Sequence, residues 1–227
     1  MNPLLIRRRG MMQAGGGGIL PPVPPLPSGY THVTSVSGKT SFACINTGII
    51  GNNNNLRILL KAKKDNTYTG STSLYSAFFG NYYSELANVS RLITADMNSN
   101  AASVNLYCNI NVKASSSVVV TDNAYDWHIY DCRHGVVIVD GVNTYTRTVE
   151  AGSSNSKKIE LNASSPVLNQ NNNEVMTHFE RFIIYDGNVM VLDYVPCVSP
   201  NNVVGFFDAV GNAFHGSGTS TPFYVDN

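Results

Sequence analysis

A closing hairpin near the C-terminal end constrains most strongly what this 227-residue chain can fold into. The apolar run 182–185 predicts a buried strand, and Asp186-Gly187-Asn188 predicts a tight turn, because Gly and Asn accept positive φ. Residues 189–195 predict the returning strand, which Pro196 is expected to end since proline lacks a backbone donor. Such a hairpin must pack against something, so we expect the rest of the chain to form sheets.

A second strand-rich stretch is predicted at residues 126–148. Strands are expected at 126–132, 135–140 and 145–148, with turns at Gly135 and at Asp140-Gly141. The single tryptophan, Trp127, is expected to anchor the core because of its large apolar ring. We expect this meander to supply the sheet against which the closing hairpin packs.

The remaining chain also favours short strands. They are expected at 30–36, 42–45, 56–62, 104–112 and 158–161, with a strand pair at 74–83 that turns near Gly80, and residues 211–221 read as a loop. No segment has a sustained helical period. The sequence therefore predicts an all-β, antiparallel two-sheet sandwich.

Composition narrows the function classes. Charged residues make up only 13% of the chain, which is low for an intracellular enzyme, and the formal net charge is zero, so no nucleic-acid partner is expected. No stretch approaches the roughly twenty apolar residues of a membrane span, and the charges follow the first apolar residues, so neither a membrane segment nor a signal peptide is expected.

Residues 1–29 differ from the domain predicted at 30–227. They contain Arg7, Arg8, Arg9, Met11 and Met12, then four glycines, then a Pro-rich run at 20–27. This run is expected to form a polyproline II rod of roughly 25 Å. Two hypotheses remain for the segment: a disordered tail, or an anchoring arm and linker.

Two segments resemble known families. Trp127-His128 leading to Asp140-Gly141 resembles the strand-turn-strand of laminin-G and concanavalin A-like jelly rolls. The C-terminal segment from Phe182 to Phe214, and the start from Pro27 to Gly48, are similar to phage structural proteins that carry such a domain. The chain departs from that family at Phe206-Phe207, where Leu-Tyr is usual, and in a long insertion at 68–97.

The sequence offers no catalytic constellation. The paired carboxylates of concanavalin-like glycosidases and the Gly-x-Ser-x-Gly elbow are both missing, and Cys132 with His134 reads as a buried thiol and a turn histidine. No cofactor or metal is expected. The four cysteines, Cys44, Cys108, Cys132 and Cys197, read as small buried hydrophobic residues, although two disulfides stay open. Candidate glycan-stacking residues are Tyr75, Tyr82 and Tyr83.

The resemblance implies a non-enzymatic virion structural protein, displayed as a head fibre or decoration. Arg7, Arg8, Arg9, Met11 and Met12 would dock to capsid or tail proteins, and the display domain would be a homo-oligomer, specifically a trimer. The expected location is the surface of a phage particle assembled in the bacterial host cytoplasm. The alternative is a glycan-binding adhesin or tail receptor-binding module for bacterial or mucosal polysaccharide.

Overall fold

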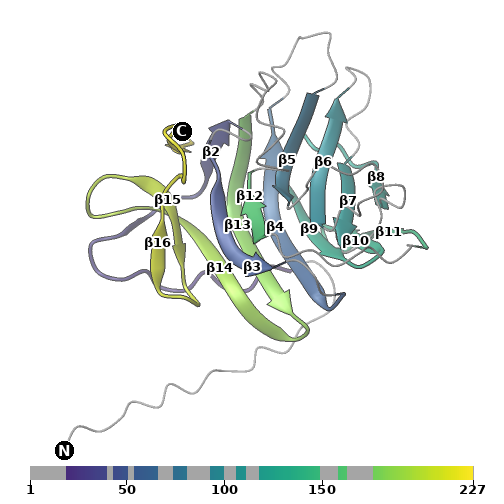
Figure 1. Ribbon diagram of the computed structural model, residues 1–227, viewed down its shortest axis with the longest axis horizontal. Helices are drawn as coiled ribbons and strands as arrows, with labels where there is room; N and C mark the ends of the chain where they lie inside the picture. Colours follow the sequence, from purple (N-terminus) through teal and green to yellow (C-terminus); the bar gives the residue numbers. More distant parts are fainter. Residues whose placement is uncertain are drawn as a thin grey trace, which may run out of the picture.

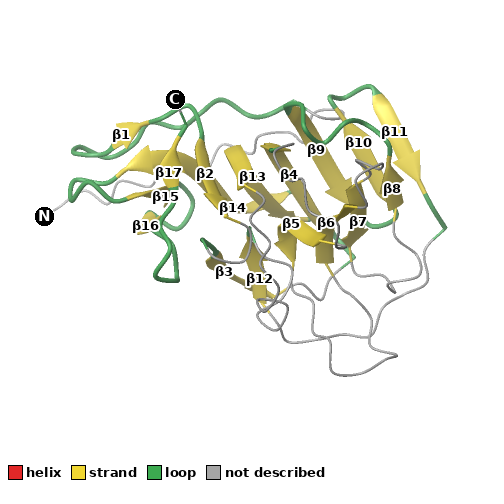
Figure 2. Ribbon diagram, turned by 90° about the horizontal axis from the view of Figure 1, so that it is seen from above, coloured by secondary structure: helices red, strands yellow, loops and turns green. Residues whose placement is uncertain are grey.

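The chain folds into two antiparallel β-sheets that lie face to face. The computed structural model describes residues 19–39, 43–50, 54–65, 74–80, 93–99, 106–110, 118–148, 158–162 and 176–226. These residues contain no helix; they form an eleven-stranded sheet, here sheet A, and a six-stranded sheet, here sheet B. Seen from above, the sheets form two layers (Figure 2). The prediction of an all-β antiparallel fold is confirmed.

Sheet A contains both stretches that the sequence singled out. Its strands run in this order: β11 (Asn143–Thr146), β10 (Val136–Val139), β9 (His128–Arg133), β4 (Leu56–Lys64), β13 (Met176–Asp186), β14 (Val189–Val198), β15 (Val204–Asp208) and β16 (Ala213–His215). Three further strands join it, β1 (Thr31–His32) on β14, β2 (Val36–Lys39) on β13, and β17 (Tyr224–Val225) on β2. Figure 1 shows the long strands β4, β13 and β14 side by side.

Sheet B is smaller and covers the inner face of sheet A. Its order is β3 (Ile45–Ile50), β12 (Lys158–Leu161), β5 (Leu74–Gly80), β6 (Ile93–Ser99), β7 (Leu106–Ile110) and β8 (Val118–Val120). Strand β12 matches the predicted range, whereas β3 begins where the predicted strand ends. Strand β16 falls inside the predicted loop 211–221.

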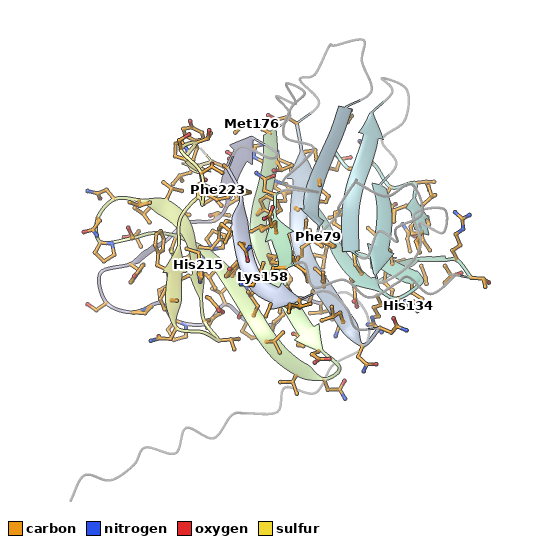
Figure 3. All side chains as sticks on the ribbon, viewed as in Figure 1. Phe79, His134, Lys158, Met176, His215 and Phe223 are labelled. Carbon is orange, nitrogen blue, oxygen red and sulfur yellow. The ribbon has the colours of Figure 1, made fainter. Side chains whose placement is uncertain are left out.

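The core between the sheets is built from large aromatic side chains. Phe79 of β5 lies 5.8 Å, centroid to centroid, from Phe182 of β13, and Phe78 lies 5.6 Å from Tyr130 of β9. All four are fully buried. Figure 3 labels Phe79 in this interior. Burying rings of this size supplies much of the hydrophobic stabilisation that two packed sheets need.

The closing hairpin is confirmed and is longer than predicted. Gly187 has a φ of 57° in the turn between β13 and β14, as a tight turn requires. Pro196, however, lies inside β14 opposite Phe206, so the prediction that it ends the strand is wrong. The Pro196 carbonyl points toward the N-terminal segment, where it accepts a hydrogen bond from the Val33 N–H at 3.3 Å. In a β-strand, the N–H and C=O of one residue point to the same side. The missing donor therefore faces the N-terminal segment and leaves the pairing with β15 intact.

The predicted meander forms β9, β10 and β11, with positive φ at Asp140 and Gly141 in the second turn. It does not face the hairpin from another sheet, because β4 pairs with β9 on one edge and with β13 on the other. The expectation that Trp127 anchors the core is also wrong. The alternation along β9 places Tyr130 and Cys132 in the core, so Trp127 falls on the opposite, outer face.

The described part of the predicted N-terminal arm contacts sheet A. Leu20 packs against Leu59 and Ile183 on the outer face, and the Pro22 carbonyl lies 3.5 Å from Nη2 of Arg181. Further on, the ring of Tyr30 lies 5.2 Å from Phe207. Residues 19–30 thus run along the sandwich. Residues 1–18, including Arg7, Arg8, Arg9, Met11 and Met12, lie outside the described residues.

Three cysteines are free thiols: Cys132 and Cys197 are buried, and Cys44 is half-buried. Burial raises the pKa of the Cys197 thiol to about 11, and burial, with the Glu160 charge, raises that of Cys44 to about 11. Both therefore stay protonated and unreactive near neutral pH. The prediction of small hydrophobic cysteines is confirmed for Cys132 and Cys197.

Tyr194 gives a test of this core. Its hydroxyl is buried and has no hydrogen-bond partner among the described residues. A buried hydroxyl without a partner costs free energy, so Tyr194→Phe is expected to leave the free energy of unfolding unchanged or to raise it by about 1 kcal/mol. Urea unfolding measures this. As a control, Phe182→Ala should lower the free energy of unfolding by about 3–5 kcal/mol. A large loss for Tyr194→Phe would show that the hydroxyl is bonded after all.

Candidate functional site

The outer face of sheet A carries a row of positive side chains along β4. Alternate residues of this strand, Arg57, Leu59, Lys61 and Lys63, point away from the core, while Ile58, Leu60 and Ala62 point into it. At about 3.3 Å per residue the row is roughly 20 Å long. We use the name cationic face for this row together with the outward residues of the neighbouring strands β9 and β13 and with Trp127, which lies just before β9.

An aromatic ring lies between the two lysines of this face. The Nζ atoms of Lys61 and Lys63 lie 5.8 Å and 5.4 Å from the centroid of the Trp127 ring. Lys61 also pairs with Glu180 at 2.5 Å. Lys63 has no carboxylate within ion-pair distance among the described residues. A partly exposed ring with adjacent ammonium groups suits a ligand that has both an apolar face and negative charge.

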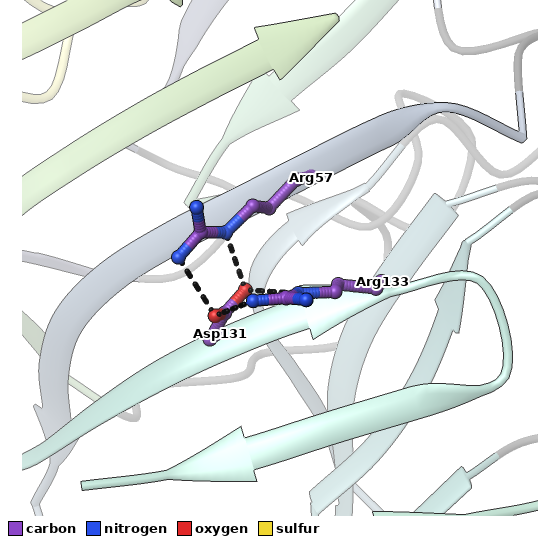
Figure 4. Close-up of polar contacts among 3 residues, drawn as sticks. All are labelled: Arg57, Asp131 and Arg133. Carbon is purple, nitrogen blue, oxygen red and sulfur yellow. Dashed lines mark hydrogen bonds and ion pairs between the residues drawn. The ribbon is translucent and has the colours of Figure 1, made fainter. Parts of the chain in front are cut away.

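At the other end of the row, two arginines hold one carboxylate. Arg57 donates to Asp131 through Nε and Nη2, both at 2.8 Å, and Arg133 does so at 3.0 Å and 2.6 Å (Figure 4). Burial alone would raise the pKa of Asp131, but the hydrogen bonds and charges of Arg133 and Arg57 outweigh it and hold the pKa below its usual value. Asp131 is therefore charged, and the three groups together keep one net positive charge.

Between these two ends the cationic face is apolar and covered. Leu59, Ile183 and Tyr185 form a buried cluster, against which Leu20, Ile129 and Met190 pack. Beside it, Arg181 and Asp193 make a buried, two-bond ion pair at 2.6 Å and 2.7 Å. The N-terminal segment at Leu20 thus divides the face into an arginine end and a tryptophan end.

His178 links the tryptophan end to the C-terminal segment. Its Nε2 lies 2.9 Å from Oδ1 of Asp65, and its Nδ1 lies 3.0 Å from Oδ1 of Asp226. Burial alone would lower the pKa of His178, but the hydrogen bonds and charges of Asp226 and Asp65 outweigh it and raise the pKa. His178 thus acts as a clamp between the Asp65 and Asp226 carboxylates, which favour its charged form.

A second polar group of residues lies on the inner side of β9. Nδ1 of His128 lies 2.7 Å from Oδ2 of Asp140, and the His128 and Tyr130 rings meet edge to face at 5.8 Å. Nε2 of His128, the Tyr130 hydroxyl and Oδ2 of Asp122 are buried without a hydrogen-bond partner among the described residues. Burial, with the charges of Cys132 and of nearby carboxylates, raises the pKa of Tyr130 far above its usual value, so its hydroxyl stays protonated.

The structure brings together few of the residues that the sequence singled out. Tyr75 belongs to β5, but its side chain is outside the described part, and Tyr82 and Tyr83 lie outside the described residues altogether. The lysines and arginines of the cationic face were missed. The alternation of residues 56–64 contained the signal, because every outward position of this strand except Leu59 is basic.

The described residues show neither a metal-binding cluster nor a membrane-spanning helix. Within the described ranges, no three His, Cys, Asp or Glu side chains gather closely enough to hold a metal ion. Asp140 and Asp208 instead accept backbone hydrogen bonds, from Ile129 at 2.8 Å and from Val210 at 3.0 Å. No described helix has the length and apolar character of a membrane span.

Comparison with known proteins gives two similar solved structures. No family model and no curated protein matches the chain. The alginate lyase AlgAT5 from polysaccharide lyase family 7 is 8% identical with a TM-score of 0.36, over 66% of this chain and 62% of that one. An alginate lyase from Corynebacterium sp. is 10% identical with a TM-score of 0.33, over 66% and 61%. The chain thus spans about three fifths of the length of each.

These matches correct two predictions. Both solved structures are enzymes. This finding contradicts the prediction of a non-enzymatic protein and the prediction of a virion structural protein, so neither prediction is carried forward. At such low identity and TM-score, the likeness assigns no activity to this chain. No contact in the structure tests the expected trimer, the capsid or tail partners or the location on a phage particle, so these stay predictions.

The clamp at His178 predicts a pH dependence of stability. Because its pKa is raised on folding, its stabilising contribution is complete below the ordinary value of 6.5 and is lost as the pH rises through the folded-state pKa. His178→Asn should therefore be less stable than the wild type in mildly acidic buffer, and the difference should shrink as the pH rises. Urea unfolding across this range measures it, with His32→Asn on the exposed strand β1 as the control. A difference that stays constant with pH would contradict the clamp.

Proposed function

We propose that the chain is a jelly roll of the concanavalin A or laminin-G kind that binds an anionic polysaccharide on the outer face of sheet A. Binding would use the cationic face, with Trp127 at one end and the arginine pair at the other. The ligand class is a chain of sugars that carry carboxylate or sulfate groups. Such a polymer presents apolar ring faces and regularly spaced negative charges, and the cationic face offers a partner for each.

The observation that carries this proposal is the placement of Trp127 between Lys61 and Lys63. The lysine ammonium groups lie 5.8 Å and 5.4 Å from the Trp127 ring, within the range of cation–π attraction. These contacts hold the ring and the charges in one place before a ligand arrives, which lowers the entropy cost of binding.

The charge balance of the chain supports a local site. The formal net charge is zero, so no field of the whole protein would attract a polyanion. At the cationic face, however, Lys63 has no described carboxylate partner and two arginines share Asp131. Binding through such a patch would weaken as salt is added, because exposed charges are screened over about 10 Å at 0.1 M ionic strength.

A second candidate function is cleavage of a polysaccharide, favoured by the polar group on the inner side of β9. The His128 Nε2 and the Tyr130 hydroxyl have no hydrogen-bond partner among the described residues, and the two rings lie 5.8 Å apart. Histidine and tyrosine are residue types that transfer protons to and from a sugar ring. Both atoms are buried, so the loop 121–127 would have to open. Incubation with acidic and neutral polysaccharides, followed by assay of new reducing ends, tests this candidate, with His128→Asn as the inactive control.

The binding proposal predicts the effect of two substitutions. Trp127→Ala should weaken binding to polygalacturonate about tenfold, because the stacking surface is lost. Lys63→Gln should weaken it less and should flatten the dependence of affinity on salt. Isothermal titration calorimetry with polygalacturonate and with the neutral glucan dextran measures both effects.

The matched control is Lys158→Gln, which removes an exposed lysine of β12 in sheet B. It should bind polygalacturonate as the wild type does. If Lys158→Gln weakens binding as much as Lys63→Gln, the attraction is a general effect of charge and the cationic face is not the site. If the wild type binds dextran as tightly as polygalacturonate, the ligand class is wrong.

A further inference from the structure

We infer that one sugar unit of the polysaccharide binds on the apolar middle of the cationic face, at the place that Leu20 now covers. Residues 19–26, here the cover, are displaced when this unit binds. This inference rests on the proposed function, because it adds a middle subsite between the arginine end and the tryptophan end. The subsite takes the apolar face of one sugar ring, while the charges of the ligand stay with the two ends.

The middle subsite lies in line with the charged side chains. Leu59 is the outward residue of β4 between Arg57 and Lys61, two positions from each. Two residues of a strand span roughly 7 Å, so a ligand that follows β4 from one charge to the next passes over Leu59. Leu20 packs at this point, against Leu59 and Ile183. The row is therefore interrupted while the cover is in place and continuous once the cover moves aside.

The cover makes contacts of the kind that a sugar ring makes. Leu20 places an apolar side chain on the cluster around Ile183. The carbonyl of Pro22, two residues further on, lies 3.5 Å from Nη2 of Arg181. A pyranose ring likewise presents C–H groups on its face and oxygen atoms at its rim. The surface under the cover thus suits a sugar unit as well as it suits the chain's own segment.

Few contacts hold the cover in place. Four of the eight residues 19–26 are prolines, which lack the backbone donor that pairing with a strand uses. Within the described chain, the cover hydrogen-bonds to the sheet only through the Pro22 carbonyl, and a length of 3.5 Å is at the limit of such a bond. Ile19 and Val23 are 81% and 53% exposed, and backbone pairing with sheet A begins at Thr31. Leu20 is therefore the main anchor of the cover.

Displacement of the cover leaves Arg181 paired. Its Nε and Nη2 donate to Asp193 at 2.6 Å and 2.7 Å, so the Pro22 carbonyl is only a third and longer contact. Loss of the partner of a buried charge is costly, and that cost does not arise here. What displacement removes is the apolar contact of Leu20, and a bound sugar ring replaces it. The apparent affinity of the wild type is thus reduced by the fraction of molecules in which the subsite is covered.

Leu20→Ser tests this competition in the full chain, with Val23→Ser as the matched control. Both substitutions remove an apolar side chain from the cover, but only Leu20 packs against the outer cluster. Leu20→Ser should bind polygalacturonate about three- to tenfold more tightly than the wild type, because the subsite is open in more molecules. Val23→Ser should bind as the wild type does. Isothermal titration calorimetry measures the three affinities.

Methyl NMR of the wild type follows the cover directly and needs no variant. Binding of galacturonate oligomers should move the Leu20 methyl signals to the chemical shifts of an exposed leucine. The methyl signals of Val23, which is exposed already, should change little. Leu20 signals that keep their positions while the oligomer is bound would show that the cover stays in place.

The outcomes separate the middle subsite from the proposed function. Tighter binding by Leu20→Ser alone, with release of the Leu20 methyl groups, supports the subsite. Wild-type binding that Leu20→Ser leaves unchanged or weakens overturns the subsite and leaves the proposed function standing. Equal tightening by Val23→Ser, or unmoved Leu20 signals in the bound wild type, also overturns it. Failure of both the wild type and Leu20→Ser to bind polygalacturonate overturns the proposed function and the subsite together.

Discussion

The double burial of β13 is the constraint on which the rest of the sandwich depends. On its inner side, Phe179, Phe182 and Ile184 fill the core, and on its outer side Ile183 is completely buried as well. A strand buried on both faces must satisfy its backbone groups through neighbouring strands, and β13 does so with β4 and β14. The two sheets, the outer cluster and the ion pairs of the cationic face are arranged around this central strand.

The outer burial of β13 also explains the charged pairs. Arg181 is 2% exposed and Asp131 is completely buried, although both lie on the face of sheet A that points away from sheet B. Buried charges need hydrogen-bonded partners, and each finds them on an adjacent strand. The N-terminal segment at Leu20 and Pro22 completes this cover. The cationic face is thus a second, partly dry layer, and its ends remain accessible for a ligand.

How far the sequence predicts this structure depends on how far apart the contacting residues are along the chain. The turns at Asp140-Gly141 and Gly187 need residues that accept positive φ, and this local requirement is visible in the sequence. The order of strands in a sheet is not local. Because β4 lies between β9 and β13, the meander and the hairpin share one sheet, and Trp127 points outward. A shift by one residue would reverse that outcome, since side chains alternate along a strand.

The sequence by itself determined most of the long strands and the turns at Asp140-Gly141 and Gly187, because alternation and turn chemistry act over a few residues. The tertiary structure alone decided the candidate site. Arg57 and Asp131 are 74 positions apart and meet only because β4 and β9 pair in one register, whereas Arg133 lies two residues from Asp131 on the same strand. No local pattern contains that register. It follows from the joint burial of two sheets, which selects one pairing among many that the same strands could form.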